Sequence, residues 1–230
     1  TDPALYDRLY HGVGSHPMTV LAQRKMVEWT GDRSLNQTLE RAVSGRDTVI
    51  LLTDGTSSPL QSPIQTWLTA RYGAEPAEKF GADTLVVYRT SLKPVEHPLD
   101  LHFGAAITLV GSNPATPTAR PGQPLAVTLH WRAAERPNRD YTTSLQLLSP
   151  AGKLVAQKDA MPMNNTLPTS GWQPGQDVYD PITLDVPANL PDGDYPLIVV
   201  LYDHATGQRL TVGTADHATL GKVHLVGSGG

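Results

Sequence analysis

The sequence predicts an α+β protein, in which a small α/β domain over residues 1–94 is followed by an all-β sandwich over residues 95–230. Helix and strand patterns alternate along the first part, whereas short strands separated by turn residues fill the second. The two patterns meet at the steps Lys93-Pro94 and His97-Pro98. Proline disfavours helix in the residue before it and cannot join a central ladder, so we expect the domain boundary there.

In the first part, apolar residues at helical spacing predict three helices, and two short apolar runs predict strands buried on both faces. The predicted helices are Met18–Trp29, Ser34–Val43 and Pro63–Tyr72, and the predicted strands are Thr48–Thr53 and Thr84–Tyr88. Gly73 is expected to end the third helix. This order of elements predicts a two-layer or three-layer α/β unit.

In the second part, apolar and polar residues alternate from Leu125 to Trp131, a period of two that buries one face of a strand. Turn dipeptides such as Pro121-Gly122 and Asp192-Gly193 separate this strand from others of similar character. The other predicted strands are Tyr141–Leu148, Leu154–Gln157, Ile182–Val186, Tyr195–Tyr202 and Val223–Val226. Short strands at this spacing predict an immunoglobulin-like sandwich.

Composition excludes several classes of function. The 230 residues include no cysteine, which removes disulfides, thiolate catalysis and cysteine-based metal sites. The formal net charge is -4 and Lys and Arg do not concentrate in one stretch, so no nucleic acid or anionic membrane surface is expected as a partner.

The longest apolar runs, such as Leu197–Leu201, are too short to span a bilayer. Because the chain begins at Thr1, we expect a processed or excised part of a longer parent.

The sharpest local motif is Thr53-Asp54-Gly55, which follows a predicted strand. Domains of the von Willebrand A type end a buried strand with a similar triplet that helps to hold a divalent cation. Such a site also needs an Asp-x-Ser-x-Ser loop, because one carboxylate cannot satisfy an octahedral cation, and the sequence has no such loop. We therefore interpret Asp54-Gly55 as a turn and predict no metal site and no cofactor.

No catalytic residue is predicted. Asp192-Gly193-Asp194 and Asp203-His204 carry groups that serve as metal ligands or as acid and base, but the remaining ligands are missing at suitable spacing. We expect Asp192-Gly193 to be the turn of a hairpin between two strands. The sequence has no nucleophile elbow, P-loop or dinucleotide fingerprint.

Three aromatic side chains are candidates for stacking on sugar rings. Trp131 shares the apolar face of the alternating strand, so core packing is the favoured interpretation. Trp172 lies in the Pro-rich and Gly-rich loop 168–175, where it either plugs one end of the sandwich or is exposed as a platform, and the plug is favoured. Trp172 and Tyr179 are the predicted carbohydrate-binding residues.

A combination of short motifs runs from Leu101 to Leu210. These motifs include Phe103-Gly104, Pro121-Gly122, Leu129-His-Trp131, Asp140-Tyr-Thr142, Trp172, Asp180, Tyr195 and Leu201-Tyr-Asp203. Together they resemble the C-terminal β-domain of bacterial multi-pass membrane glycosyltransferases of the dolichyl-phosphate-mannose mannosyltransferase-like family. The N-terminal part, through Trp67-Leu68 and Phe80-Gly81, resembles the soluble segment that follows the last membrane helix in those proteins.

The resemblance implies an extracytoplasmic location in the cell envelope, attached to a membrane-embedded parent. In such transferases the catalytic carboxylate and the lipid-phosphate-sugar site lie in the membrane part, so no catalytic residue carries over to this chain. The implied function is a non-catalytic accessory or recognition module that contacts a glycan or an envelope acceptor, with the membrane portion of the parent as its partner.

Two alternatives stay open at this stage. A structural or adhesive cell-surface protein would assemble through strand edges or a large apolar interface. A free-standing carbohydrate-active enzyme would have a deep pocket with two facing carboxylates.

Overall fold

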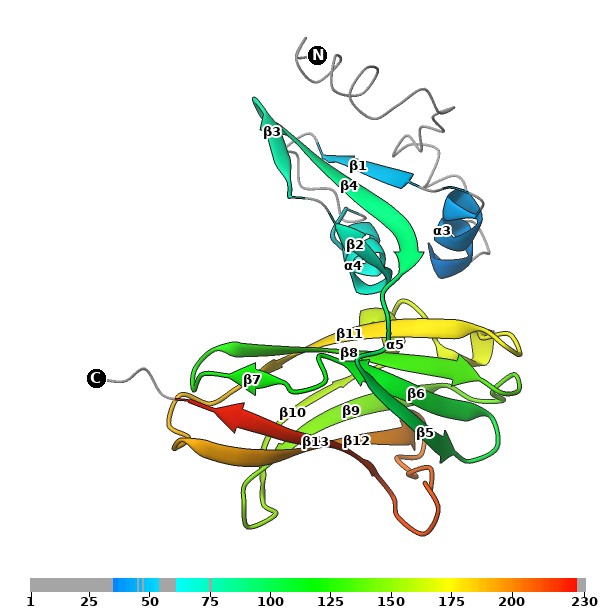
Figure 1. The fold of residues 1–230 in the computed structure, drawn as a ribbon. Coiled ribbons are helices and arrows are strands. Elements are labelled where there is room, and N and C mark those ends of the chain that lie inside the picture. The colour runs from blue at the N-terminus through cyan, green and yellow to red at the C-terminus, as the bar shows by residue number, and fades with distance from the viewer. Residues whose placement is uncertain (1–34, 45, 47, 54–60, 75, 227–230) are drawn as a thin grey trace. The chain divides into compact units, whose positions relative to one another are not determined.

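The computed structural model describes residues 35–44, 46, 48–53, 61–74 and 76–226. The chain divides into two compact units, residues 1–93 and 94–230, and each sheet is made of strands from one unit (Figure 1). The predicted helix 18–29 and the motif Asp54-Gly55 lie outside the described residues. Among the helices that are described, none has the length and apolar character needed to cross a membrane.

The sheet of the N-terminal unit is organised around one long central strand, β4 (Asp83–Leu92). Three strands pair with β4, all antiparallel: β1 (Thr48–Thr53), β2 (Tyr72–Ala74) and β3 (Glu78–Phe80). The sequence predicts an α/β unit, a class in which the strands of the sheet are mostly parallel. The pairing is antiparallel, so this part of the prediction is wrong. Two residues suffice to join β3 to β4, a connection that only antiparallel neighbours permit.

Two of the predicted helices are present, as α3 (Leu35–Val43) and α4 (Gln61–Arg71). Their apolar positions are buried as the spacing predicts, with Leu39, Trp67 and Leu68 exposed by 2% or less. The helix α4 ends at Arg71, one residue before the predicted end, but Gly73 lacks the left-handed conformation of a stop glycine and lies in β2.

The expectation that both strands of this unit are buried on both faces holds for one of them. Leu85, Val86, Val87 and Tyr88 on the central strand β4 are all buried. The residues of β1 are half-buried and Leu52 is 45% exposed, because β1 pairs on one side only within the described sheet. A strand at the edge of a sheet has fewer neighbours to cover it.

The second unit is a β-sandwich of two sheets (Figure 1). One sheet has the strand order β10-β9-β12-β13-β7 and the other has the order β11-β8-β6-β5. All pairings are antiparallel except that of β13 with the short β7. The strands are β5 (His97–Phe103), β6 (Ile107–Asn113), β7 (Thr118–Ala119), β8 (Pro124–Ala133), β9 (Tyr141–Leu148), β10 (Leu154–Ala160), β11 (Asp177–Asp185), β12 (Gly193–Asp203) and β13 (Ala218–Leu225).

The alternation from Leu125 to Trp131 is confirmed as the inner face of β8. The four apolar residues of this face are exposed by 3% or less, and β11 continues the face with Val178, Ile182 and Leu184 in register. Trp131 packs edge-to-face on Phe103, with ring centroids 5.5 Å apart. Core packing is therefore the role of Trp131.

Strands β5, β6 and β7 were not predicted, and for β5 the reason is that His97-Pro98 indicates a junction more strongly than a strand. Pro98 is tolerated because β5 is the outermost strand of its sheet in the described residues. Pro98 pairs with Gly111 of β6, and a side chain at Gly111 would collide with the backbone of His97 and with Val95. The glycine therefore lets the edge strand lie close to its neighbour.

The predicted hairpin at Asp192-Gly193 is wrong. β11 and β12 belong to different sheets, so the chain crosses from one layer to the other between them. The crossing is held by Tyr195, which is 2% exposed and donates a hydrogen bond from its hydroxyl to the carbonyl of Pro191 at 3.0 Å. The same residue types form the turns of hairpins and the connections between sheets, so the sequence does not distinguish the two at Asp192-Gly193.

Candidate ligand-binding cavity

The two predicted carbohydrate-binding residues are buried in the sandwich. Trp172 is 1% exposed, and its indole N–H donates to the carbonyl of Leu167 at 3.3 Å. Tyr179 is 7% exposed and packs edge-to-face on His130, with ring centroids 4.5 Å apart. Neither ring offers an open face to a sugar, so the prediction that these residues bind carbohydrate is wrong for this structure. The burial of Trp172 supports the alternative interpretation, in which it plugs one end of the sandwich.

The sandwich has a cavity of about 300 Å³ at one end, where three connections between strands come together. The turn between β5 and β6 contributes residues 104–106, the loop between β8 and β9 contributes residues from 135 to 138, and the long connection between β12 and β13 contributes Leu210. Phe103 and Tyr141 add the ends of two strands. The cavity is thus assembled from segments far apart in the sequence.

Backbone hydrogen bonds tie the three connections to one another. The amide of Ala134 donates to the carbonyl of Ala106 at 2.8 Å, which joins the β8–β9 loop to the β5–β6 turn. The amide of Gly104 donates to the carbonyl of Thr211 at 3.1 Å, which joins that turn to the β12–β13 connection. Gly104 has a φ of 58°, a left-handed conformation that favours glycine. The walls of the cavity are therefore held by main-chain contacts.

The short helical turn η1 (Thr169–Gly171) fixes the β8–β9 loop from the other side. The hydroxyl of Thr169, which is fully buried, donates to the carbonyl of Arg139 at 2.7 Å and accepts the amide of Tyr141 at 2.9 Å. The amide of Ser170 donates to the carboxylate of Asp140 at 3.0 Å. These bonds on both sides of residue 140 leave the loop little freedom to rearrange.

An ion pair closes the same end of the sandwich. Arg139 donates from Nη1 to Oδ2 of Asp203 at 2.6 Å, and Asp203 Oδ1 accepts the amides of Ala205 and Thr206. The hydrogen bond from Arg139 holds the pKa of Asp203 below its usual range. The motif Asp203-His204 is therefore a structural turn: His204 also shares a hydrogen bond with Thr142 at 3.0 Å between its Nδ1 and the threonine hydroxyl.

The lining of the cavity combines apolar and polar groups. Ala106 and Leu210 supply half-buried apolar surface, whereas Glu135, Arg136 and Asn138 supply a carboxylate, a guanidinium and an amide from one short loop. The three polar residues are exposed. Arg136 donates from Nε to the carbonyl of Ser170 at 3.1 Å, which holds the guanidinium beside the loop. Such a surface can hold a ligand that has one apolar face and several hydroxyl groups.

A separate buried polar group lies between the two sheets. Asp180 is 2% exposed, stands on the inner face of β11, and accepts the amide of Met163 at 2.8 Å. Burial raises the pKa of Asp180 to about 6, although the Met163 amide and the nearby side chains of Trp131 and Thr143 act in the opposite direction. Met163 begins a run of three non-glycine residues with φ between 52° and 68°. Asp180 therefore anchors a backbone turn that is intrinsically unfavourable.

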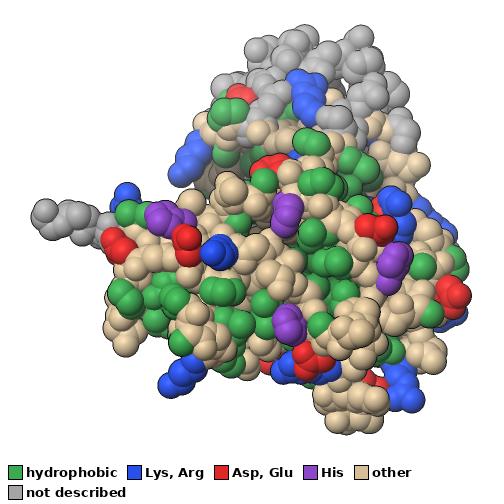
Figure 2. Space-filling model, turned by 60° about the horizontal axis from the view of Figure 1, so that its bottom comes forward, with side chains coloured by type: hydrophobic (Ala, Val, Ile, Leu, Met, Phe, Trp, Pro, Cys, Tyr) green, Lys and Arg blue, Asp and Glu red, His purple; other side chains and the backbone are tan. Residues whose placement is uncertain are grey.

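The described residues hold no cluster of three or more His, Asp or Glu side chains that would bind a metal ion. On the face drawn in Figure 2, acidic and basic side chains are interspersed, and those drawn there do not gather by sign into one patch.

Comparison with known proteins gives distant similarity only. No protein-family model matches the chain, and no curated protein matches it in sequence. The C-terminal domain of wzt aligns at 11% identity over 59% of this chain and 84% of that one, with a TM-score of 0.38. The CARDB domain of the PF1109 protein from Pyrococcus furiosus, in complex with di-metal ions, aligns at 12% identity over 59% of this chain and 95% of that one, with a TM-score of 0.31. Similarities of this strength assign no function.

A third comparison is equally distant. A Niemann-Pick type C2 protein from the Japanese carpenter ant aligns at 8% identity over 47% of this chain and 79% of that one, with a TM-score of 0.31.

The polar residues of the cavity were not predicted from the sequence. These residues lie in the segment from Ala134 to Arg139, a run of charged and polar residues with a proline between two strands. That composition signals a surface loop, and loops on rigid scaffolds carry most binding sites. The signal was present, but the partners of the loop across the cavity follow only from the fold.

Proposed function

We propose that this chain is a non-catalytic accessory or recognition module of a cell-envelope membrane glycosyltransferase, in which the sandwich unit contacts a glycan or an envelope acceptor. The observation that carries this proposal is the cavity of about 300 Å³ built by three connections at one end of the sandwich. Sandwich domains gather their loops at two ends, and these ends are where such domains bind ligands.

The topology supports an immunoglobulin-like interpretation of the sandwich. The long strands divide between two sheets, the chain crosses between the sheets from β11 to β12, and β7 runs parallel beside β13. The Tyr195 hydroxyl bonds to the carbonyl of Pro191, four residues earlier, which is the arrangement of a tyrosine corner. A fold alone does not give a function, so the proposal rests on the cavity.

The lining of the cavity favours binding over glycoside hydrolysis. Hydrolysis of a glycosidic bond ordinarily uses two carboxyl groups that face each other across the bond. Among the described residues that line this cavity, Glu135 is the one carboxylate. A single carboxylate beside a guanidinium and an amide suits the recognition of hydroxyl groups.

The remaining parts of the proposal rest on the sequence motifs. The resemblance to membrane glycosyltransferases supports an extracytoplasmic position, attachment to a membrane-embedded parent, and a partner surface on the membrane portion of that parent. A chain without cysteine is compatible with that compartment.

The test uses the full chain in two assays. In the first, envelope oligosaccharides are titrated into ¹⁵N-labelled protein, and we expect amide shifts in the sandwich unit. In the second, lipid-phosphate sugars, nucleotide sugars and aryl glycosides are incubated with the protein and with a heat-denatured control, and we expect equal product in both. Enzymes exceed the uncatalysed rate by about a million-fold or more, so even a poor catalyst would stand clear of the control. Turnover that survives repurification would overturn the proposal.

A further inference from the structure

We propose that the loop-end cavity binds the ring of a single uncharged pyranose sugar, with Glu135 and Asn138 as its hydroxyl-binding residues. This inference rests on the proposed function and names the ligand class of the same cavity. Four properties of the described residues support it: the volume of the cavity, the chemistry of its lining, its charge, and the rigidity of its walls.

The volume limits how much of a ligand the cavity, which is open to solvent, can enclose. Cavities that hold small molecules range from about 300 to 1,000 Å³, and this cavity of about 300 Å³ stands at the lower end of that range. An extended oligosaccharide would have to leave most of its rings outside. The cavity therefore suits a terminal sugar or one side branch of a glycan.

The lining contains both apolar and hydrogen-bonding groups, which match the two kinds of surface of a pyranose ring. Such a ring has apolar C–H faces and a periphery of hydroxyl groups, each of which is both donor and acceptor. Ala106 and Leu210, which are half-buried, provide apolar contact. In the same lining, Glu135 can accept hydrogen bonds and Asn138 can both donate and accept them. A purely apolar ligand would leave these polar groups unsatisfied.

The local charge favours a neutral ligand. Glu135 and Arg136 are neighbours of opposite sign in the lining, so their charges sum to zero. The next cation along the loop, Arg139, is paired with Asp203 at 2.6 Å, which compensates its charge as well. A uronic acid or a sugar phosphate would meet the Glu135 carboxylate without an uncompensated cation to hold it.

Hydrogen bonds within the chain hold the walls of the cavity. The amide of Ala134 is held by Ala106, the side chain of Arg136 by Ser170, and the backbone at Arg139 and Tyr141 by the buried Thr169 hydroxyl. Binding therefore does not require ordering of the loop, and little conformational entropy of the loop is lost. This offsets in part the weak binding expected from a small contact area. For one ring we expect dissociation constants of about 1–10 mM, typical of contacts this limited.

The experiment is an NMR titration of the full ¹⁵N-labelled chain with methyl glycosides. The neutral probes are methyl β-D-glucopyranoside, methyl α-D-mannopyranoside and methyl β-D-galactopyranoside, and methyl β-D-glucuronide is the anionic counterpart of the first. We expect at least one neutral probe to shift amides in the three segments that line the cavity, and the glucuronide to bind about tenfold more weakly than its best neutral counterpart. Equal or tighter binding of the glucuronide would overturn the ligand class.

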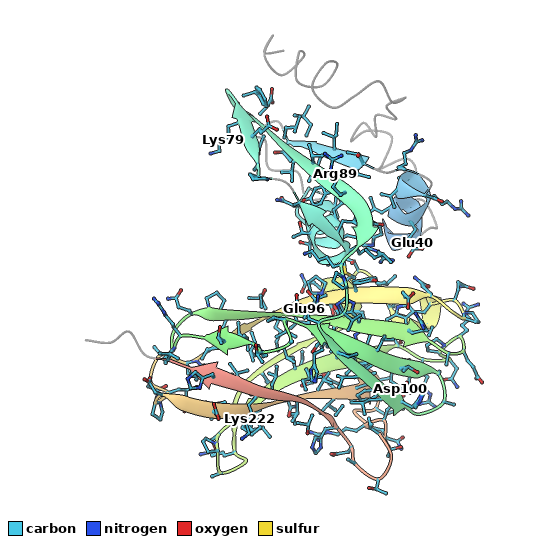
Figure 3. The ribbon with its side chains drawn as sticks, in the orientation of Figure 1. Glu40, Lys79, Arg89, Glu96, Asp100 and Lys222 are labelled. Atoms are coloured by element: carbon cyan, nitrogen blue, oxygen red, sulfur yellow. The ribbon has the colours of Figure 1, made fainter. Side chains whose placement is uncertain are left out.

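Two exposed substitutions locate the site without threatening the fold. Glu135→Gln and Asn138→Ala are each expected to weaken binding of the neutral probe by about tenfold, since the first replaces a charged acceptor with a neutral amide and the second removes the amide. The matched control is Asp100→Asn, which removes one exposed carboxylate from the edge strand β5, where Figure 3 labels it. The control is expected to bind the probe as the wild-type chain does.

The outcomes separate this inference from the proposed function. Binding that is unchanged in Glu135→Gln and Asn138→Ala, with amide shifts elsewhere in the sandwich, would overturn the cavity as the site and leave glycan recognition standing. An absence of binding to all monosaccharide probes, with binding to envelope oligosaccharides, would overturn the single-ring ligand alone. An absence of binding to every saccharide would overturn both.

Discussion

Arg71 in the N-terminal unit and Asp180 in the sandwich are both buried ionisable side chains, but their surroundings compensate the charge in opposite ways. Arg71 donates from Nη2 to the carboxylate of Glu40 at 3.3 Å, and its guanidinium lies 4.6 Å from the centre of the Trp67 ring. Asp180 accepts one backbone amide, and the side chains that act on its pKa are the neutral groups of Trp131 and Thr143.

The difference shows how side-chain chemistry decides which solution is available. A guanidinium stays charged at any pH that a folded protein meets, so a buried arginine needs an anion or a ring face. Figure 3 shows Glu40 on α3, which places that anion within reach of α4 in the same unit. A buried carboxyl group can instead take up a proton, and burial raises the pKa of Asp180 to about 6 accordingly. Arg71 thus keeps its charge, whereas Asp180 loses its charge as the pH falls through about 6.

The largest expected effect tests whether the two units are stabilised by separate cores. Trp172→Ala removes an indole that is 1% exposed and leaves a large cavity, so we expect the sandwich to lose about 3–5 kcal/mol of stability. Hydrogen exchange measured by mass spectrometry should then accelerate in peptides from residues 94–226 and stay unchanged in peptides from residues 35–93. Equal acceleration in both sets would show one cooperative unit. A melting temperature that is unchanged, together with lost glycan binding, would restore Trp172 as an exposed platform.

The second effect tests the pH dependence of the buried carboxyl group. In the folded state the pKa of Asp180 is raised from 3.8 to about 6, so its contribution to stability is complete below pH 3.8 and is lost as the pH rises through 6. Asp180→Asn keeps the size and an acceptor for the Met163 amide but cannot ionise. The stability of the wild-type sandwich relative to the variant should therefore fall by about 2–3 kcal/mol between pH 4 and pH 8.

The measurement is denaturant unfolding of both proteins at each pH, because the titration of all other groups cancels in the difference between them. The variant is expected to be relatively more stable at pH 8 than at pH 4. Stability curves that run parallel across this range would show that Asp180 stays ionised, and a fall in the opposite direction would show that its folded-state pKa is lowered.

Part of the fold follows from the sequence because the signal is local. The alternation from Leu125 to Trp131 has one physical cause, burial of one face of a strand, and the structure places those residues accordingly. The same periodicity was available for Asp180, since Val178, Ile182 and Leu184 share its face. The predicted strand began only at Ile182, because an aspartate followed by Pro181 resembles the end of a strand.

Other features depend on pairing partners that local patterns do not specify. From the sequence, Pro98 indicates a junction, and only the sheet topology shows that it lies in the edge strand β5. In the same way, Asp192-Gly193 indicates a hairpin, and only the topology shows that the strands on either side belong to different sheets. The cavity has the same character, because Ala106, Glu135 and Leu210 meet only after both sheets have formed. The prediction of Trp172 and Tyr179 rests on their aromatic rings alone, and aromatic side chains contribute to protein cores as well as to binding sites.

The smallest expected effect tests the ion pair of the N-terminal unit. Arg71 is 7% exposed, whereas the Glu40 side chain is 35% exposed, so solvent screens the pair from one side. Glu40→Gln keeps a hydrogen-bond acceptor near the guanidinium, and the Trp67 ring remains in place, so we expect a loss of only about 0.5–1 kcal/mol. The pair is isolated by a double-mutant cycle with Arg71→Met, which retains the apolar stem of the arginine. Unfolding free energies of the four proteins should give a coupling of about 0.5–1 kcal/mol that decreases in high salt. A coupling near zero would assign the stabilisation of Arg71 to the Trp67 ring, and a coupling of several kcal/mol would mean that the pair is buried as completely as Asp180.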